Sequence, residues 1–424
     1  MTGLRLYRLA LGLGVALLGV LFVGYGYENT WQLWNIPTMS PCFADLRTIT
    51  HGVRSRAMGY DPLVENPADP WGRTMNYPRI WEILWQLGVN EHHTVYLGIV
   101  VNLLFLIALY VFPPRTLETV TAAILLPLIF SPAVLLGAER GNTDLLIFFL
   151  MTVVLLLLRR GSSLADAIAL ATLLFAFVLK LFPIFGLPVL LRERKPVFIR
   201  LSLLALLVAG VYLAAIYDDL VLIRQGTPKG TQLSYGVNVL WMRVAKSHAS
   251  WALAFRVLAY TGVCGAGGLA LLGLFDSAGR EGTPDMEAQT RLDAFRIGSG
   301  IYLGTFLLGN NWDYRLVFLL FTVPQLMSWA RSHTGHPAWM AKMAIIGTFV
   351  SVWHLVIKRF LNPLAGETLT FALDEGANWV VFFCLAFLLS YSAPEWIKSG
   401  MSYARRNRGA RSNRRSQCAI IRGL

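Results

Sequence analysis

The sequence predicts an all-α, polytopic membrane protein with about 10–12 transmembrane helices, and three observations lead to that prediction. Hydrophobic residues make up 55% of the 424 positions and charged residues only 14%, whereas about a quarter of a soluble chain is charged. The mean hydropathy is +0.55. Apolar runs close to the ~20 residues that cross a bilayer recur from one end of the chain to the other.

The apolar runs place twelve candidate spans along a single domain, residues 1–392. The first span follows two arginines and is too long for the apolar part of a signal peptide, so we expect it to be retained. Two runs near the middle are each too short to cross alone and are separated by Lys180, which indicates a broken or re-entrant pair. The spans are residues 5–25, 94–112, 117–137, 144–158, 164–179, 181–191, 197–217, 251–275, 294–309, 314–330, 340–357 and 378–392.

Basic residues assign an orientation to these spans. With the N-terminus in the cytoplasm, the inner segments contain 22 of the 37 Lys and Arg residues but 9 of the 24 acids, which is the whole net charge of +13. Because positive residues favour the cytoplasmic side, we expect a plasma-membrane or inner-membrane protein with both termini in the cytoplasm. The long outer segments are then residues 26–93, 218–250 and 358–377. The first contains an amphipathic pattern over residues 78–87, typical of a helix at the membrane surface.

The last segment, residues 393–424, is a basic tail that we expect to be disordered. It carries eight Lys and Arg residues. A cytoplasmic tail that faces anionic lipid headgroups explains this charge, so membrane lipids rather than nucleic acid are the expected partners. The cysteines have no metal-binding spacing and are expected to be free thiols; they are Cys42, Cys264, Cys384 and Cys418.

Three polar segments interrupt the apolar pattern, and the orientation brings all of them to the outer face. They are residues 139–144, 180–183 and 310–315. Ionisable groups at the mouth of a membrane bundle are costly and usually mark a ligand or ion site. Arg140, Lys180 and Arg315 are cations beside apolar walls, a setting that suits the phosphate of a lipid. Asp45, in the first outer segment, is suited to accept a proton from a hydroxyl group.

The motifs resemble a known superfamily. Asp45, followed by Gly-Tyr-Asp-Pro at 59–62 and Tyr-Pro at 77–78, resembles the GT-C integral-membrane glycosyltransferases. Three further motifs resemble, more narrowly, the polyprenol-phosphate-mannose-dependent mannosyltransferases of glycosyltransferase family 87 and their bacterial relatives. These motifs are Glu-Arg-Gly-Asn-Thr-Asp at 139–144, Lys-Leu-Phe-Pro at 180–183 and Asn-Trp-Asp-Tyr-Arg at 311–315. The resemblance covers most of residues 40–330 and implies a GT-C fold with a long first outer loop that carries interfacial helices.

The resemblance also implies a reaction. It is an inverting transfer of a hexose, mannose in this family, from a polyprenyl-phosphate sugar to a hydroxyl of a glycan or glycolipid acceptor at the extracytoplasmic face. Asp45 matches the catalytic base, and Arg140, Lys180 and Arg315 are expected to bind the donor phosphate. No metal cofactor is expected, because phosphate is already a good leaving group and the first outer segment has no Asp-X-Asp pair. The residues expected to bind sugar or acceptor are Glu139, Asn142, Asp144, Asn311, Trp312, Asp313 and Tyr314.

Some of these residues also have a plain structural explanation. Asp45 can be a loop carboxylate paired with Arg47 or Arg54. Asn142 and Asp144 can cap the span that begins at residue 145, because short polar side chains accept hydrogen bonds from the first turn of a helix. Capping and sugar contact both remain open for this pair.

The remaining polar residues have alternatives too. Glu139 and Arg140 can form an interfacial ion pair, Lys180 can extend to the membrane surface, and Trp312 can belong to an interfacial aromatic belt. A histidine of the first outer segment, such as His51, is a second candidate for the base. A transporter or flippase of a lipid-linked sugar is the alternative function, because broken spans and intramembrane charges occur in that class as well.

Overall fold

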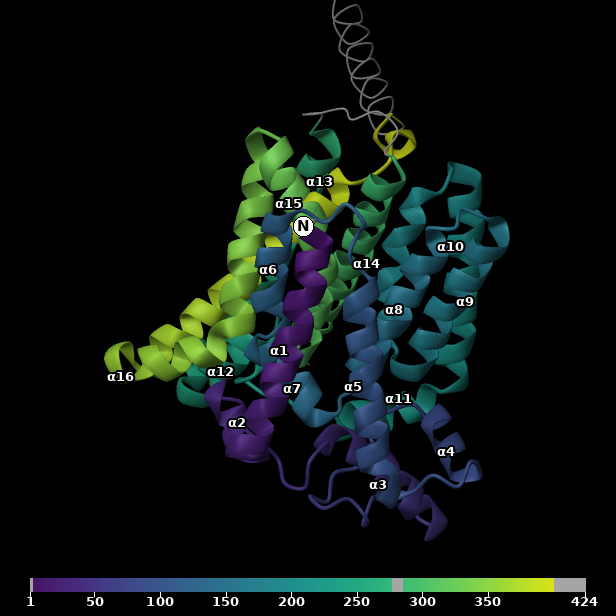
Figure 1. Cartoon of the computed structure of the whole chain (residues 1–424), viewed down its shortest axis with the longest axis vertical. Helices are drawn as coiled ribbons and strands as arrows, with labels where there is room; N and C mark the ends of the chain where they lie inside the picture. The colour runs from purple at the N-terminus through teal and green to yellow at the C-terminus, as the bar shows by residue number, and fades with distance from the viewer. Residues whose placement is uncertain (1–2, 277–284, 400–424) are drawn as a thin grey trace, which may run out of the picture.

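The computed structural model describes residues 3–276 and 285–399 of the chain. Within these residues, 16 α-helices and five 3-10 helices account for almost all regular structure, and one sheet pairs two short strands. Figure 1 shows long helices side by side in one bundle, with loops and short helices gathered at the end opposite the N-terminus. The prediction of an all-α, polytopic protein is confirmed in this coarse form.

The elements follow one another in two stretches. The first stretch is α1 (Gly3–Tyr25), α2 (Tyr27–Leu33), α3 (Ala44–Ala57), η1 (Arg79–Glu82), α4 (Ile83–Gln86), η2 (Glu91–His93), α5 (Thr94–Val111), α6 (Thr119–Ile129), α7 (Pro132–Arg140), α8 (Asp144–Leu158), α9 (Ser163–Lys180) and η3 (Phe182–Arg192). The second stretch is α10 (Lys195–Ala215), α11 (Tyr217–Gly226), β1 (Ser234–Tyr235), α12 (Val239–Ser247), η4 (Ala249–Trp251), α13 (Ala252–Phe275), α14 (Met286–Leu308), β2 (Asn311–Trp312), η5 (Asp313–Phe321), α15 (Val323–Ser332) and α16 (Gly335–Tyr391).

Six helical segments of the described chain are long and apolar enough to cross a bilayer, and one bent pair raises the number to at most seven. The six are α1, η2 with α5, α9, α10, η4 with α13, and α16, and the pair is α6 with α7, bent by 50°. The predicted number of about 10–12 is therefore too high by this criterion. Three predicted spans are missing because α8 has 15 residues, η3 has 11, and the first turns of α14 carry charged side chains. Residues 314–330 are divided between η5 and α15, and α16 counts once where two spans were predicted.

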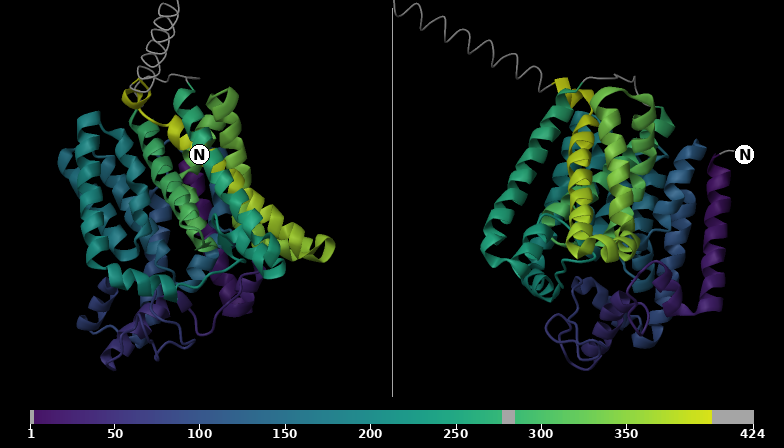
Figure 2. Two further views of the ribbon diagram at one scale, coloured as in Figure 1. Left: turned by 180° about the vertical axis from the view of Figure 1, so that it is seen from behind. Right: turned by 90° about the vertical axis from the view of Figure 1, so that its left-hand side faces the viewer.

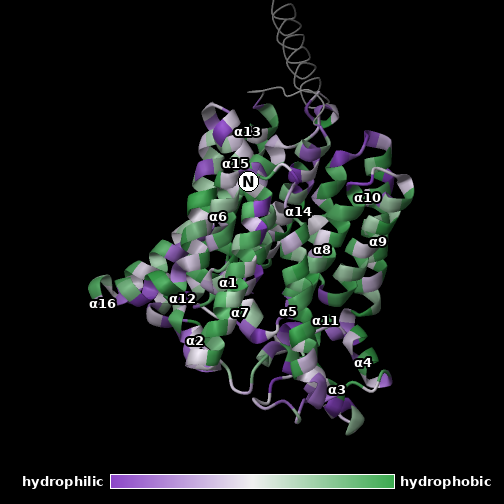
Figure 3. Cartoon of the chain, viewed as in Figure 1, coloured by the Kyte–Doolittle hydropathy of each residue, from purple (hydrophilic) through white to green (hydrophobic). Residues whose placement is uncertain are grey.

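The outer faces of α1, α10 and α13 are apolar and exposed. Only 11%, 11% and 17% of their most apolar windows are buried, and Val23 on α1 is 91% exposed. Figure 3 shows the apolar colour along the sides of the bundle and most of the polar colour at its two ends. Exposed apolar surface of this extent suits lipid rather than water. The fold therefore supports a membrane protein, while the kind of membrane and the orientation remain predictions.

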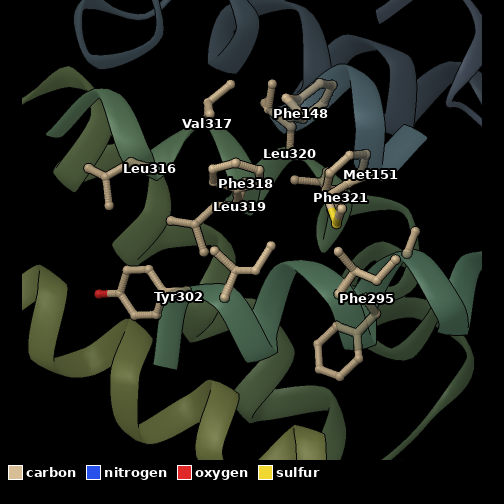
Figure 4. Close-up of a cluster of buried hydrophobic side chains, with 14 of the residues drawn as sticks. Phe148, Met151, Phe295, Tyr302, Leu316, Val317, Phe318, Leu319, Leu320 and Phe321 are labelled. Carbon is tan, nitrogen blue, oxygen red and sulfur yellow. The ribbon is translucent and has the colours of Figure 1, made fainter. Parts of the chain in front are cut away.

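The centre of the bundle lies where α14 packs against η3 and η5. Side chains of α8, α14 and η5 meet there (Figure 4), and the rings of Phe148 and Phe321 stack with their centroids 4.2 Å apart. The backbones approach closely because α14 has glycines at the contact: a Cβ on Gly300 would lie 2.2 Å from the carbonyl oxygen of Phe185. Small residues permit such packing between helices in membranes. A Cβ on Gly298 of α14 would lie 2.6 Å from the carbonyl oxygen of Phe318, so α14 also packs closely against η5, whose first turn carries Arg315.

Residues 26–93, which we call the loop layer, cover one end of the bundle. Arg79 is central to it, since its guanidinium group lies 2.8 Å from Asp61, 2.8 Å from Asp219 and 3.0 Å from Glu82. Hydrogen bonds from Arg79 hold the pKa of Asp61 below its usual range. Asp219 belongs to α11, so these ion pairs join the loop layer to the second of the predicted outer segments.

The amphipathic pattern over residues 78–87 forms a helix in two short pieces, η1 and α4. Leu84 packs against the buried cluster of the loop layer, whereas Ile83 and Leu87 are 48% and 70% exposed. An interfacial helix shows this division between a packed side and an apolar exposed side. The predicted helix is confirmed, and its contact with the membrane stays a prediction.

The predicted break at Lys180 is present, but the prediction that the preceding run is too short to cross alone is wrong. α9 has 18 residues and passes as a span by itself. It ends at Lys180 because Leu181 adopts φ 50° and ψ −49°, a conformation through which an α-helix does not continue. η3 follows, with Pro183 in its first turn and Pro188 inside it. Proline has no backbone N–H, which favours this irregular winding over a regular α-helix.

Residues 358–377, the third predicted outer segment, lie within one long helix, and their place outside the membrane stays a prediction. These residues are helical, since α16 runs from Gly335 to Tyr391 with a kink at Gly366, where φ is 80° and ψ is 163°. Glycine adopts this conformation at no steric cost, so two helices continue across the kink at an angle. Figures 1 and 2 show that the kinked part projects sideways from the bundle. We call residues 358–377 the arm; on it Phe360 is 67% exposed and Leu364 is 83% exposed.

Most of the predicted basic tail, residues 393–424, lies outside the described residues, which end at 399. The described beginning of this segment is packed rather than free. Trp396 Nε1 donates a hydrogen bond to the carbonyl oxygen of Glu193 at 3.2 Å, and Lys398 Nζ donates to that of Tyr391 at 2.8 Å. The contact between the segment and the bundle therefore extends beyond the predicted boundary at residue 392.

Candidate functional site

Five polar side chains that the sequence analysis selected form one network beneath the loop layer. Asn142 Nδ2 donates to Asp45 Oδ2 at 2.6 Å, and Lys180 Nζ donates to Asn142 Oδ1 at 2.8 Å. Asp144 receives two cations, with Lys180 Nζ at 2.6 Å and Arg315 Nε at 3.1 Å. We call Asp45, Asn142, Asp144, Lys180 and Arg315 the buried network. It joins four regions that are far apart in the sequence: α3, the turn from α7 into α8, the end of α9, and η5.

The network continues into strand β2 at Asn311. The side-chain oxygen of Asn311 accepts a hydrogen bond from Arg315, and its amide nitrogen donates to the carbonyl oxygen of Thr305. The strand is held in place by antiparallel pairing, with Tyr235 opposite Asn311. Asn311 therefore uses both halves of its amide inside the protein.

The turn between α7 and α8 positions the middle of the network. α7 ends at Gly141, which adopts the left-handed conformation with φ 58° and ψ 34°. Asn142 Oδ1 accepts a hydrogen bond from the backbone N–H of Asp144 at 2.8 Å. A Cβ on Gly141 would lie 3.0 Å from the Phe43 side chain, so the turn packs directly against the start of α3. Asn142 thus stabilises the helix start and also contacts Asp45 and Lys180.

Burial makes the charges of the network depend on one another. The Asp144 side chain is completely buried, and those of Lys180 and Arg315 are only 11% and 14% exposed. A buried carboxylate is tolerated because two cations and their hydrogen bonds compensate the loss of water. Lys180 also lies over the rings of Tyr77 at 5.0 Å and Tyr314 at 5.9 Å, which adds cation–π attraction.

A cavity of about 210 Å³ opens beside Asp45. Asp45, Arg73 and Arg140 contribute charged groups to its wall, whereas Lys180 and Arg315 lie behind the wall. Burial raises the pKa of the Tyr77 hydroxyl in this wall. We call this space the first cavity; it is lined by Met39, Asp45, Thr48, Arg73, Thr74, Asn76, Tyr77, Leu136, Arg140, Gly226, Pro228, Leu233, Trp312 and Tyr314.

Glu139 and Arg140 form the ion pair that the sequence left as an alternative, and they also attach the loop layer. Glu139 Oε2 lies 3.2 Å from Arg140 Nη1. Glu139 Oε1 accepts a hydrogen bond from the backbone N–H of Met39 at 3.0 Å, and Arg140 Nη2 donates to the carbonyl oxygen of Pro37 at 2.8 Å. The pair thereby fixes residues 37–39 at the edge of the first cavity and keeps the Arg140 guanidinium group in its wall.

Arg73 is a site residue that sequence reasoning missed. Its guanidinium group binds Asp69 through two hydrogen bonds of 3.2 and 3.0 Å and donates to the carbonyl oxygen of Ala44 at 2.6 Å. Arg73 Nη1 lies 3.9 Å from Asp45 Oδ1. The two arginines considered as partners of Asp45 are not the ones that approach it. The spacing of Asp69 and Arg73 was the available signal, but it lies in a loop without periodicity.

Consecutive residues of the 311–315 motif point to different places. Trp312 and Tyr314 line the first cavity, and their predicted role in sugar binding stays a prediction. Asp313 does not line it; its Oδ2 lies 3.4 Å from His354 Nε2 of α16. His354 was missed because it stands within the apolar run 340–357, where a single histidine carries no spacing signal. A sugar that contacts Asp313, as predicted, would therefore have to approach it from the side of His354.

A second cavity of about 240 Å³ lies on that side. All charged groups that line this cavity come from α16: His354, Lys358, Glu367 and Asp374. Leu233, which has a positive φ of 55°, lines both cavities and stands between them. The second cavity is lined by Asn35, Pro37, Thr231, Gln232, Leu233, His354, Leu355, Lys358, Glu367, Thr370, Phe371 and Asp374.

The histidines of the loop layer do not compete with Asp45 for the first cavity. His51 is 7% exposed, its Nδ1 lies 3.1 Å from the carbonyl oxygen of Arg47 within α3, and burial lowers its pKa. His92 and His93 belong to η2, where His93 takes part in the cap at Asn90. None of the three is among the residues that line the cavity.

Comparison of the chain with models of known protein families, with curated proteins and with solved structures gives no match. The fold and the composition alone define the class of protein: a helical, polytopic membrane protein with a charged cavity at one end. The resemblance of its motifs to the GT-C glycosyltransferases stays a prediction.

Proposed function

We propose that the first cavity is the active site of an inverting glycosyltransferase. It transfers a hexose from a polyprenyl-phosphate sugar to an acceptor hydroxyl at the extracytoplasmic face. One observation carries the proposal: the Asp45 carboxylate shares a cavity wall with the guanidinium groups of Arg73 and Arg140. A carboxylate beside two cations suits a reaction in which a hydroxyl loses a proton while a phosphate departs.

Asp45 has one oxygen available for the proton. Its Oδ2 accepts the hydrogen bond from Asn142 at 2.6 Å, which fixes the orientation of the carboxylate. Its Oδ1 lies 3.9 Å from Arg73, which is too far for a direct hydrogen bond but close enough for attraction. Oδ1 is therefore the oxygen that receives the proton of the acceptor, and Asn142 is a positioning residue.

The chemical step balances without a further reactant. The acceptor oxygen attacks the anomeric carbon from the face opposite the phosphate and transfers its proton to Asp45 Oδ1. The new glycosidic C–O bond forms as the bond from the anomeric carbon to the phosphate oxygen breaks. The electron pair leaves with the lipid phosphate, and the configuration at the anomeric carbon is inverted.

Arg140 and Arg73 are the cations that face the donor in this proposal. Each retains an acidic partner, Glu139 for Arg140 and Asp69 for Arg73, so their side chains are oriented before the donor binds. Such preorganised charge stabilises a developing phosphate anion without reorganisation during the reaction. Direct phosphate binding by Lys180 and Arg315 stays a prediction, and it requires that both exchange Asp144 for the phosphate.

The sugar would lie against Trp312 and Tyr314, because aromatic faces pack well against the C–H groups of a pyranose ring. Both rings line the first cavity. Mannose as the hexose, and a glycan or glycolipid as the acceptor, come from the family resemblance alone.

The test uses the purified full chain in lipid nanodiscs with a panel of polyprenyl-phosphate hexoses. Asp45→Asn should lower kcat by about 10²- to 10⁴-fold, the usual contribution of a general base, and leave the KM for the donor nearly unchanged. Glu65→Gln is the matched control, because Glu65 is an exposed carboxylate of the same loop layer. This control variant should transfer at the wild-type rate.

Two results would overturn the proposal. One is full transfer activity in Asp45→Asn with normal donor affinity. The other is movement of the intact lipid-linked sugar across a vesicle bilayer without release of free lipid phosphate, which is the behaviour of a flippase.

A further inference from the structure

The second cavity lies between the two legs of the arm. Lys358 comes from the leg before the kink at Gly366, and Thr370, Phe371 and Asp374 come from the leg after it. The arm projects from the side of the bundle (Figure 1) and exposes large apolar side chains. The arm therefore both lines a polar cavity and carries an exposed surface that suits lipid chains.

The charged groups of this cavity are ordered by depth. His354 and Asp374 line the inner part of the wall, with side chains 9% and 13% exposed. Asp313 is not part of the wall; its side chain is 1% exposed and lies behind His354. We call these three side chains the deep end. Those of Lys358 and Glu367 are 27% and 46% exposed and form the rim.

The deep end contains two carboxylates and one imidazole. His354 Nδ1 lies 2.9 Å from the carbonyl oxygen of Ser351, which can only accept, so Nδ1 is protonated. His354 Nε2 faces the Asp313 carboxylate at 3.4 Å, an approach that is favourable when a proton lies between the two groups. Whether that proton belongs to His354 or Asp313, the pair together with ionised Asp374 has a charge of −1. Among the described residues, neither oxygen of Asp313 has a hydrogen-bond partner, although the residue is fully buried.

The rim has the opposite excess. Glu367 Oε1 lies 2.8 Å from Arg243 Nη2 and 3.9 Å from Lys358 Nζ, so one carboxylate is shared by two cations. Arg243 also lies over the ring of Phe371 at 5.6 Å, which keeps it beside the cavity. The cavity thus becomes more negative with depth and more positive toward its opening.

We propose that the second cavity binds the headgroup of an ethanolamine phospholipid. The ammonium group lies in the deep end at Asp374 and the Asp313–His354 pair, and the phosphate lies at the rim beside Lys358. The acyl chains follow the apolar surface of the arm. This site does not depend on the glycosyltransferase function proposed for the first cavity, because it is defined by binding alone.

A primary ammonium fits the deep end better than the other common headgroup tips. It carries the positive charge that the cluster lacks and three N–H donors for carboxylate oxygens. A choline group has the charge but cannot donate, and a glycerol group donates but has no charge. When lipids with identical acyl chains are compared, a difference in affinity between headgroups measures the contribution of the deep end. A change in affinity that is the same for every phosphate lipid measures the contribution of the rim.

The experiment measures lipid binding to the delipidated full chain by native mass spectrometry. The lipids are palmitoyl-oleoyl phosphatidylethanolamine, phosphatidylcholine, phosphatidylglycerol and phosphatidylinositol. The wild type should bind the ethanolamine lipid about tenfold more tightly than the others, which is the value of one hydrogen-bonded charge. Asp374→Asn should remove this preference. Asp218→Asn is the matched control, since Asp218 is exposed and lines neither cavity.

Lys358→Gln keeps the proposal testable if Asp374→Asn fails to fold, because Lys358 lies at the rim. This variant should lower the affinity of the chain for the ethanolamine lipid and for the glycerol lipid by the same factor. Equal affinity of the wild type for all four lipids would overturn the proposal. So would a preference for phosphatidylinositol that Asp374→Asn abolishes, which would indicate a sugar-type headgroup. Phosphoethanolamine has the same headgroup but no acyl chains. If an equimolar amount of it displaced the lipid, the proposal that the arm binds the acyl chains would be overturned.

Discussion

The buried network and the deep end of the second cavity both place carboxylates inside the same end of the bundle, but their partners differ. Asp144 has two cations, at 2.6 and 3.1 Å. Asp313 has one ion-pair contact in the described structure, with His354 at 3.4 Å, and no hydrogen-bond partner for either oxygen. The first arrangement compensates its charge internally. The second leaves charge for another molecule to compensate.

The difference follows from how many segments supply side chains. Four regions that are distant in the sequence meet at the buried network, and each adds a donor or an acceptor. The three side chains of the deep end, Asp313, His354 and Asp374, come from η5 and α16 only. A network assembled from many segments suits a scaffold that holds Asp45 in one orientation, whereas an incomplete cluster beside a cavity suits ligand binding.

Removing the carboxylate of the buried network tests its scaffold role and should give the largest effect. Asp144→Asn leaves Lys180 and Arg315 buried without an anion, so the free energy of unfolding should fall by about 3–5 kcal/mol. The measurement is unfolding by titration with SDS in mixed micelles. Asp218→Asn, on the exposed surface of α11, should change the value little, and an equal loss in both variants would contradict the scaffold role.

A pair of glycine variants tests whether the turn at Gly141 serves the network. Gly141 and Gly161 both have left-handed backbones, with φ 58° and 62°, but only Gly141 has neighbours within 4 Å of an added Cβ. Gly161→Ala should cost about 1–2 kcal/mol of unfolding free energy, from the backbone alone. Gly141→Ala should cost more and should also slow transfer, since its Cβ pushes on Phe43 and displaces Asn142 from Asp45. Equal losses of stability with unchanged transfer would show that the turn does not position the network.

The contrasting variant in the second cavity is Asp313→Asn. It removes a carboxylate that is poorly compensated, so stability should change by less than about 1 kcal/mol or increase. The same SDS titration decides this prediction. A loss as large as that of Asp144→Asn would mean that the two regions are energetically alike, and the comparison would fail.

The smallest effect is expected at the surface of the loop layer, where Asp61 pairs with Arg79. The folded-state pKa of Asp61 is lowered, so its contribution to stability is fully present above the unfolded-state pKa of about 3.9. It is lost as the pH falls through the folded-state pKa. Because the Asp61 side chain is 36% exposed, solvent screens the pair and the contribution should be below about 1 kcal/mol. Arg79→Gln should flatten the decline of stability between about pH 5 and pH 3, and an unchanged slope would contradict this assignment.

The convergence of Asp45 with residues 139–144, Lys180 and Arg315 was predictable from the sequence, because polar groups that interrupt apolar runs are costly unless they meet one another. Their individual partners were not predictable. Lys180 and Arg315 were assigned to a phosphate, yet both face Asp144, since only the three-dimensional arrangement decides which of several nearby anions a cation contacts.

The arm and His354 show a different limit of the sequence. Residues 358–377 were recognised only as a segment between two apolar runs, and they are helical because charged residues such as Lys and Glu are good helix formers. His354 was hidden for the opposite reason, since its neighbours are apolar and its partners lie in other segments. The predicted number of spans exceeds the six or seven that length and composition give, because the apolar runs of the sequence include short helices such as α8, which has 15 residues.

Leu233 has a consequence for how specificity in this chain can change. It forms part of the wall of both cavities, and its backbone has a φ of 55°, which a leucine adopts at a cost of about 1–3 kcal/mol and a glycine without cost. A change to glycine at this position would relieve the backbone and remove the side chain between the two spaces. We therefore expect that this single substitution would enlarge both cavities at their shared wall and would not be opposed by the local backbone.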